Sequence, residues 1–201
     1  MILLPRYKHL VQKPSCCGAA CLQMILLRRG HWLEQEDLAL SLGTKVKKNQ
    51  AALFSKNLSI SDENPGVDLH HFAEINESIL KLYKLKATVL MISEIPDLGM
   101  MIRDNLTLDN DLIVNFCWLA YNPERNWGHF SLISSLENSK VELCDPSIDS
   151  KDYWRTPLKK LQEAMDKKWD GRERGIALIS SLIEAQQSLI SHRFSSDSPS
   201  A

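Results

Sequence analysis

The feature that most constrains the fold is an apolar segment of helical length at residues 17–29. Pro14 and Ser15 precede it, and Gly30 follows it at the position of a helix C-terminal cap. Apolar side chains occupy nearly the whole circumference of this helix, which predicts that it is buried rather than lying on the surface. The fold is therefore expected to be built around a helix near the N-terminus. Its apolar residues are Ala19, Ala20, Cys21, Leu22, Met24, Ile25, Leu26 and Leu27.

The remaining pattern places helices mainly before strands, which predicts an α+β fold with a C-terminal antiparallel sheet. The length of 201 residues fits one domain over residues 1–185, followed by a flexible Ser-rich tail at 186–201. We expect helices at 17–29, 34–42, 68–84, 96–105 and 156–169, strands at 87–92, 112–119, 128–136 and 140–145, and irregular structure at 44–66. Residues 175–182 are expected to form either a last strand or the start of a terminal helix.

Composition excludes several classes of function. The formal net charge is −1, so no bulk electrostatic attraction to nucleic acid or to an anionic membrane is expected. No apolar run is long enough to span a bilayer, and Pro5, Arg6 and Lys8 interrupt the opening Met1–Leu4 before it can resemble a signal peptide. We therefore expect a soluble cytoplasmic protein, although an exported effector without a signal would look the same. The oligomeric state stays open.

The pattern of cysteines favours a reactive thiol over a disulfide-bonded framework. Their number is five, and three of them, Cys16, Cys17 and Cys21, are close together. An odd count argues against an all-paired disulfide framework, and no CxxC pair supports a zinc site. His70 and His71, near Asp68 and Glu74, fall on an expected helix, where adjacent side chains point about 100° apart. We expect no metal and no cofactor.

Cys17 is the candidate nucleophile because it falls at the N-terminus of the buried helix. Free N–H groups and the helix dipole at that position stabilise a thiolate. Gly18 follows it and allows a substrate to approach the backbone closely. Gln12 lies five residues earlier, and its side-chain amide can donate to a developing oxyanion. Without this context, a small buried cysteine that only packs is the commoner role.

A histidine and an acid complete the candidate site. Among six histidines, only His129 stands at the start of a strong strand, directly after Trp127 and Gly128. Trp127 is equally consistent with a wall of the active site and with a packed loop anchor. Asp145 ends the next strand, where it would orient the imidazole, although a turn residue before a proline is also common.

The hairpin register decides whether these two side chains can meet. If residues 137–139 form the loop, Leu136 faces Lys140. Asp145 then faces Ser131 and lies diagonal to His129 on the same face of the sheet. A loop of even length without a bulge would place the two side chains on opposite faces.

These residues resemble the motifs of a known family. The segment from Gln12 through Cys17-Gly18-Ala19-Ala20-Cys21 resembles the nucleophile motif of the double-glycine leader peptidases, which process bacteriocins and belong to the papain-like superfamily. Residues 128–133 resemble the family's histidine strand, and residues 141–146 resemble its Asp-Pro motif. The resemblance covers about residues 10–165. It implies a papain-like fold with a buried nucleophile helix packed on an antiparallel sheet, Cys17 as nucleophile, His129 as base, Asp145 as orienting acid and Gln12 in the oxyanion hole.

Two features depart from the family pattern. Cys16 occupies a position that usually holds an acidic or amide residue, and the phosphate-binding GxxxxGK[ST] motif of the family's transporters is absent from the sequence. The leading hypothesis is a thiol peptidase acting on a peptide or protein substrate, with Gly18, Trp127 and Gly128 in substrate binding. The same three catalytic groups would also serve a deamidase, transglutaminase or transpeptidase. A catalytically inert peptide-binding domain is the non-enzymatic alternative.

Overall fold

Helix α1 (Cys17–Arg28) lies at the centre of the structure, as its apolar sequence predicts. The computed structural model describes residues 5–166 and 171–182. Within them, α1 is buried from Cys17 to Leu26, and Gly30 ends it with a φ of +81° that a residue with a side chain rarely adopts. The helix packs mainly on β5 and α2.

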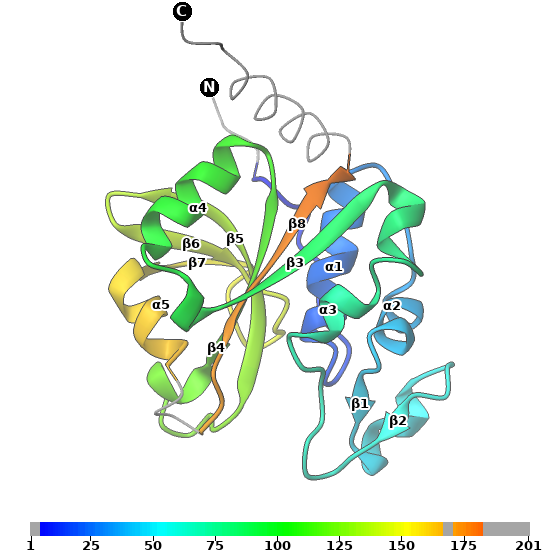
Figure 1. The fold of residues 1–201 in the computed structure, drawn as a ribbon. Coiled ribbons are helices and arrows are strands. Elements are labelled where there is room, and N and C mark those ends of the chain that lie inside the picture. Colours follow the sequence, from blue (N-terminus) through cyan, green and yellow to red (C-terminus); the bar gives the residue numbers. More distant parts are fainter. Residues whose placement is uncertain (1–4, 167–170, 183–201) are drawn as a thin grey trace, which may run out of the picture.

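The other helices lie on both sides of the main sheet. Figure 1 shows α1 to α3 with a small parallel sheet on one side of the main sheet and α4 with α5 on the other. The helices are α2 (Gln35–Ser41), α3 (His71–Glu74), α4 (Leu98–Thr107) and α5 (Leu158–Ala164), and the 3₁₀ segments are Lys48–Leu53, Leu80–Tyr83, Ile92–Glu94 and Trp118–Ala120.

A six-stranded antiparallel sheet forms the middle layer, with strand order β3-β8-β4-β5-β6-β7. The fold is therefore α+β, with the buried helix α1 packed on an antiparallel sheet, as expected. The strands are β1 (Lys45–Val46), β2 (Ser59–Ile60), β3 (Leu85–Met91), β4 (Asp111–Cys117), β5 (Gly128–Glu137), β6 (Lys140–Cys144), β7 (Tyr153–Pro157) and β8 (Gly175–Ser181).

The two faces of the sheet bury two separate clusters of apolar side chains. Alternation along β4 sends Ile113 to the cluster around α1, whereas Leu112 and Val114 join the cluster beneath α4 and α5. Strand β5 divides in the same way, with Leu132 on one side and Ile133 on the other. The sheet is thus covered on both faces.

A buried carboxylate fixes the far end of α1. Asp111, at the start of β4, has no exposed surface, and it accepts hydrogen bonds from Arg28 Nη1 at 3.0 Å and Arg29 Nε at 2.8 Å. The hydroxyl of Tyr7 donates to the same carboxylate at 3.0 Å. Helix α1, strand β4 and the N-terminal segment therefore meet at one charged group.

Three expectations about the elements were wrong or incomplete. Residues 44–66, expected to be irregular, contain β1, the 3₁₀ segment Lys48–Leu53 and β2. The helix expected at 68–84 is interrupted, because only His71–Glu74 is α-helical and Leu80–Tyr83 forms a 3₁₀ turn that ends at Lys84 in the left-handed region. Strand β7 was not predicted, and α5 begins at Leu158 after it. The expected tail at 186–201 lies outside the described residues.

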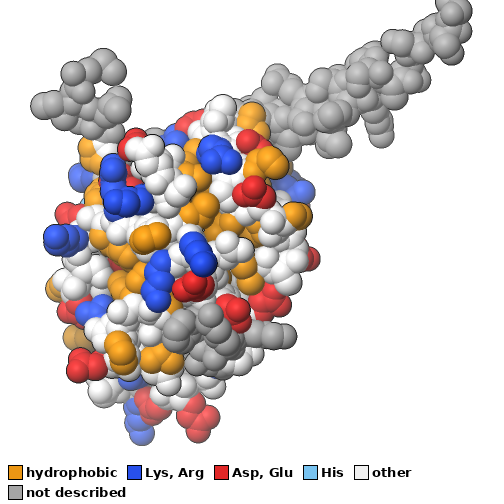
Figure 2. Space-filling model, turned by 90° about the vertical axis from the view of Figure 1, so that its left-hand side faces the viewer, with side chains coloured by type: hydrophobic (Ala, Val, Ile, Leu, Met, Phe, Trp, Pro, Cys, Tyr) orange, Lys and Arg blue, Asp and Glu red, His pale blue; other side chains and the backbone are white. Residues whose placement is uncertain are grey.

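The surface matches the balanced composition. On the face shown in Figure 2, basic and acidic side chains are interspersed among small apolar patches. Among the described residues, no helix is both long enough and apolar enough to cross a lipid bilayer.

Candidate active site

Cys17 is the first residue of α1, and its side chain lies at the edge of the buried core. Its exposed fraction is 9%, so the residue is largely buried but keeps a small accessible surface. The preceding residue, Cys16, makes no side-chain hydrogen bond that caps the helix. The N–H groups of the first turn therefore point toward the nucleophile end of the helix without a side-chain partner from the cap.

His129 and Asp145 form a buried hydrogen-bonded pair. His129 lies near the start of β5 and Asp145 directly follows β6, and His129 Nε2 is 2.7 Å from Asp145 Oδ1. The same oxygen accepts the backbone N–H of Ser147 at 2.9 Å, and Oδ2 accepts Trp154 Nε1–H at 2.9 Å. Three donors thus hold the carboxylate in place.

The protonation of the pair reflects both burial and its partners. Burial opposes the charged imidazolium, but the interactions of the ring with Asp145 and with Cys17 outweigh it and raise the pKa of His129 to about 9. Burial likewise opposes the ionised carboxylate, and the hydrogen bond and charge of His129 overcome it and lower the pKa of Asp145. The Cys17 side chain is thus near enough to influence the pKa of His129, and a thiol, an imidazole and a carboxylate meet at this place.

The hairpin that brings the pair together differs from the expected one in its loop. Leu136 pairs with Val141, and the loop has two residues, Asn138 and Ser139, with φ values of 49° and 60°. Positive φ at both central positions is typical of a tight two-residue hairpin turn. An even loop alone would have separated the two side chains.

A β-bulge restores the register that the site needs. The pairing shifts between Ile133 and Ser135, and beyond the shift Leu132 faces Cys144. This is the register that the sequence predicted for that end of the hairpin. The extra residue at Ser134 moves His129 and Asp145 to one face, so the prediction of their proximity is confirmed although its loop was wrong.

The segment before α1 lies against the loop that carries Asp145. The backbone N–H of Gln12 donates to the carbonyl of Pro146 at 2.8 Å, and His9 Nε2 is 2.8 Å from the backbone oxygen of Asp145. The buried Oε1 of Gln12 has no hydrogen-bond partner among the described residues. Gln12 is therefore held beside the Asp145 loop with its side-chain amide oxygen unsatisfied.

The three expected substrate-binding residues have different surroundings. Gly18 is buried, whereas Trp127 is 50% exposed and its backbone oxygen accepts the N–H of Trp118 at 3.0 Å. A Cβ on Gly128 would lie 3.1 Å from Nη2 of Arg174. Trp127 is thus available to a ligand, and Gly128 is confined by an arginine.

Gly18 is required by its neighbours, which leads to a stability prediction. A Cβ at this position would lie 2.9 Å from Val67 Cγ1 and 3.1 Å from the end of the Phe72 ring. Helix propensity favours alanine over glycine, but overpacking costs about 1–3 kcal/mol. We expect Gly18→Ala to lower the free energy of unfolding in urea denaturation. A more stable variant would contradict the close packing of residues 67–72 on α1.

Sequence reasoning missed the aromatic side chains around the histidine. The His129 ring centroid is 5.5 Å from those of Phe116 and Trp118, and Trp118 stacks on Trp154. Trp154 lies on the unpredicted strand β7. The available signal was the strand preference of Tyr153, Trp154 and Thr156, but the segment is too short for this preference to be distinctive.

The other cysteines pack in the interior. All five thiols are buried and free. Burial raises the pKa of Cys16 to about 12 and that of Cys144 to about 11, and it raises the pKa of Cys21 well above the ordinary value. Cys16, Cys21 and Cys144 are therefore protonated at neutral pH.

Solved structures share this arrangement of helix and sheet. A crystal structure described as a C39-like peptidase from Bacillus anthracis is similar with a TM-score of 0.56 and 14% sequence identity, over 86% of this chain and 94% of that chain. This chain has the C39-like peptidase fold. The peptidase domain of Streptococcus ComA, a bifunctional ABC transporter, is similar with a TM-score of 0.52 and 18% identity, over 86% of this chain and 97% of that one.

The C39-like fold is thus shared at low sequence identity. No protein-family model matches the sequence, and no curated protein matches it. The resemblance to double-glycine peptidase domains that the sequence motifs indicated is confirmed at the level of the fold.

Proposed function

We propose that this protein is a cysteine hydrolase that cleaves a peptide or isopeptide bond in a peptide or protein substrate. The observation that carries the proposal is the buried His129–Asp145 hydrogen bond, together with the interaction of the same imidazole with Cys17 at the start of α1. The C39-like fold supports it, because the solved proteins with this fold are described as peptidases.

The proposed reaction begins with transfer of the Cys17 proton to His129. The thiolate attacks the substrate carbonyl, and the oxyanion accepts hydrogen bonds from the Gln12 side-chain amide and from N–H groups of the first turn of α1. His129 then gives its proton to the leaving amine, leaving an acyl group on Cys17. Water activated by His129 hydrolyses this thioester and regenerates the thiol. Asp145 holds the imidazole throughout.

Gly18, Trp127 and Gly128 belong to the proposed substrate path. Gly18 and Gly128 are the sequence neighbours of Cys17 and His129, and neither has a side chain that would crowd a substrate there. Trp127 offers an exposed aromatic surface next to the histidine strand for an apolar substrate side chain.

Alkylation by iodoacetamide tests the nucleophile without knowledge of the substrate. At mildly acidic pH we expect Cys17 to react on the order of 100-fold faster than an unassisted thiol, because an ordinary cysteine with a pKa of about 8.5 is almost entirely protonated there. Peptide mapping by mass spectrometry would locate the label, with Cys16 and Cys21 as controls within the same chain. Equal labelling of Cys16 and Cys17, or none of Cys17, would refute the assignment.

The type of reaction is tested on a library of peptides. Incubation with the wild-type protein is expected to give new peptide ends that a Cys17→Ala variant does not give. A mass gain of about one dalton at glutamine, without new ends, would instead identify a deamidase that uses the same residues.

A further inference from the structure

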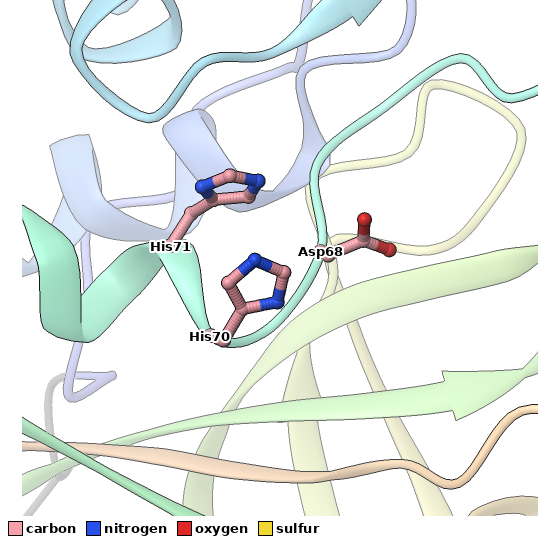
Figure 3. A group of neighbouring side chains, drawn as sticks. All are labelled: Asp68, His70 and His71. Atoms are coloured by element: carbon pink, nitrogen blue, oxygen red, sulfur yellow. The ribbon is translucent and has the colours of Figure 1, made fainter.

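Three potential metal ligands meet on the loop that leads into α3. The carboxylate of Asp68 and the imidazoles of His70 and His71 each have a ligand atom within 4.8 Å of the other two. Figure 3 shows the two rings at the start of α3 and Asp68 on the preceding loop. None of the three belongs to the candidate active site.

The two histidines lie closer together than a regular helix would allow. Their ring centroids are 4.2 Å apart, whereas the sequence predicted side chains about 100° apart on one helix. The expectation of one regular helix was incomplete, because His70 precedes α3 in a turn that the His71 N–H closes on the Asp68 carbonyl at 3.2 Å, and the two rings lie together there. Both rings can therefore face one ion.

Glu74 contacts the His71 ring and favours the tautomer that can bind a metal ion. Its Oε2 is 2.7 Å from Nδ1 of His71, which leaves Nε2 as the unprotonated nitrogen when Nδ1 donates. Its Oε1 is also 3.7 Å from Nε2 of His70. A carboxylate that fixes a histidine tautomer from behind is a recurrent feature of metal sites.

The distances and donor types select the class of ion. Ligand atoms at about 2.0–2.2 Å from one ion lie within roughly 4.4 Å of each other, so a separation of 4.8 Å requires only a small side-chain rotation. Asp68 and His70 are exposed and have room for it. Two imidazoles and one carboxylate suit a zinc-type ion, whereas calcium and magnesium prefer all-oxygen sites.

We propose that Asp68, His70 and His71 bind one Zn²⁺-class divalent ion, with Glu74 as the residue that positions His71. The site lies beside the nucleophile helix, because Val67 packs against Gly18 from the same loop. Phe72, the residue after His71, contacts Gly18 as well. The ion fastens the loop that covers the start of α1, and with three protein ligands it keeps a coordination position open.

Calorimetric titration of the full chain with Zn²⁺ tests the proposal. The titration uses a Cys17→Ala background so that the proposed nucleophile cannot bind the ion as a thiolate. We expect one ion per chain, and His70→Ala or His71→Ala should weaken the affinity by about 10-fold or more, with Glu74→Gln weakening it about 10-fold. His31→Ala removes a histidine that lies against Tyr83 instead and should leave the affinity unchanged.

Co²⁺ absorption and the melting temperature distinguish binding at this site from binding at a thiolate and from loss of the fold. Co²⁺ bound to this site should give visible absorption bands without the intense charge-transfer band of a thiolate ligand. Zn²⁺ should raise the melting temperature of the parent but not that of the His70→Ala variant. His70 is 63% exposed at its side chain, so its replacement should not alter the fold in EDTA. Unchanged affinity in a His70→Ala/His71→Ala variant, no binding, or a thiolate band would overturn the proposal.

Discussion

Replacing Asp145 with asparagine should lower the rate of peptide cleavage by a factor of about 10⁴, as the loss of the orienting acid does in serine hydrolases. Asparagine preserves the size of the side chain but removes the charge that stabilises the imidazolium of His129, with which Asp145 shares a 2.7 Å hydrogen bond. An amide has only one accepting oxygen, so either His129 Nε2–H or Trp154 Nε1–H would face an N–H donor instead of an acceptor. The measurement is the initial rate of appearance of new peptide ends in the peptide library.

Asp152→Asn is the matched control for this change. The Asp152 side chain is 70% exposed, and the contact of Asp152 with Asp145 is made by its backbone oxygen, which accepts the Asp145 N–H at 3.0 Å. That contact survives the substitution, so the rate should stay close to that of the wild type. If Asp145→Asn also kept most of the wild-type rate, Asp145 would not be the orienting acid.

The same substitution should change how stability depends on pH. The pKa of His129 is raised to about 9 in the folded protein, so its protonation stabilises the fold below its unfolded pKa of about 6.5. This contribution is lost as the pH rises from about 6.5 to about 9. We expect urea denaturation to show this decline in the wild type and a flatter profile in Asp145→Asn. Equal profiles would show that the pair is not coupled.

Asp111→Ala should be the most destabilising single change outside the candidate active site. It removes the buried acceptor shared by Arg28, Arg29 and Tyr7 and leaves partly buried cations without their partner. Breaking a buried ion pair in this way costs about 3–5 kcal/mol. The free energy of unfolding from urea denaturation provides the measurement, and it should fall by that amount.

Asp109→Ala provides the comparison for Asp111. Asp109 also forms ion pairs with Arg6 and Arg28, but its side chain is 63% exposed. Exposed ion pairs contribute less than about 1 kcal/mol. Similar losses for the two variants would mean that burial of Asp111 does not govern the stability of this cluster.

The sequence predicted the part of the site that depends on local pattern. Residues 14–30 indicate the start, the end and the burial of helix α1, so the position of Cys17 at its N-terminus could be inferred. The strand that carries His129 was equally clear from its apolar run. These elements depend on periodicity and on capping residues, which act over short distances.

The parts that failed depend on contacts between distant residues. Trp154 donates to Asp145 from β7, a strand whose pairing with β6 is not encoded in its own few residues. The bulge at Ser134 has no sequence signature. The sequence predicted a three-residue loop, whereas the hairpin has a two-residue loop, and the bulge offsets that difference in the pairing of β5 with β6. The interrupted helix near His71 is another case in which tertiary packing, here of Phe72 on Phe130, overrides helical propensity.

The position of β8 in the sheet has a consequence for the time at which activity can arise. Strand β8 (residues 175–181) lies between β3 and β4 and pairs with both. These two strands precede β8 in the sequence, so they cannot form their hydrogen bonds to it until β8 has been synthesised. Ala177 and Ile179 also complete the apolar cluster that holds α1. During synthesis on the ribosome, the thiol-bearing helix therefore lacks its finished support until this strand emerges.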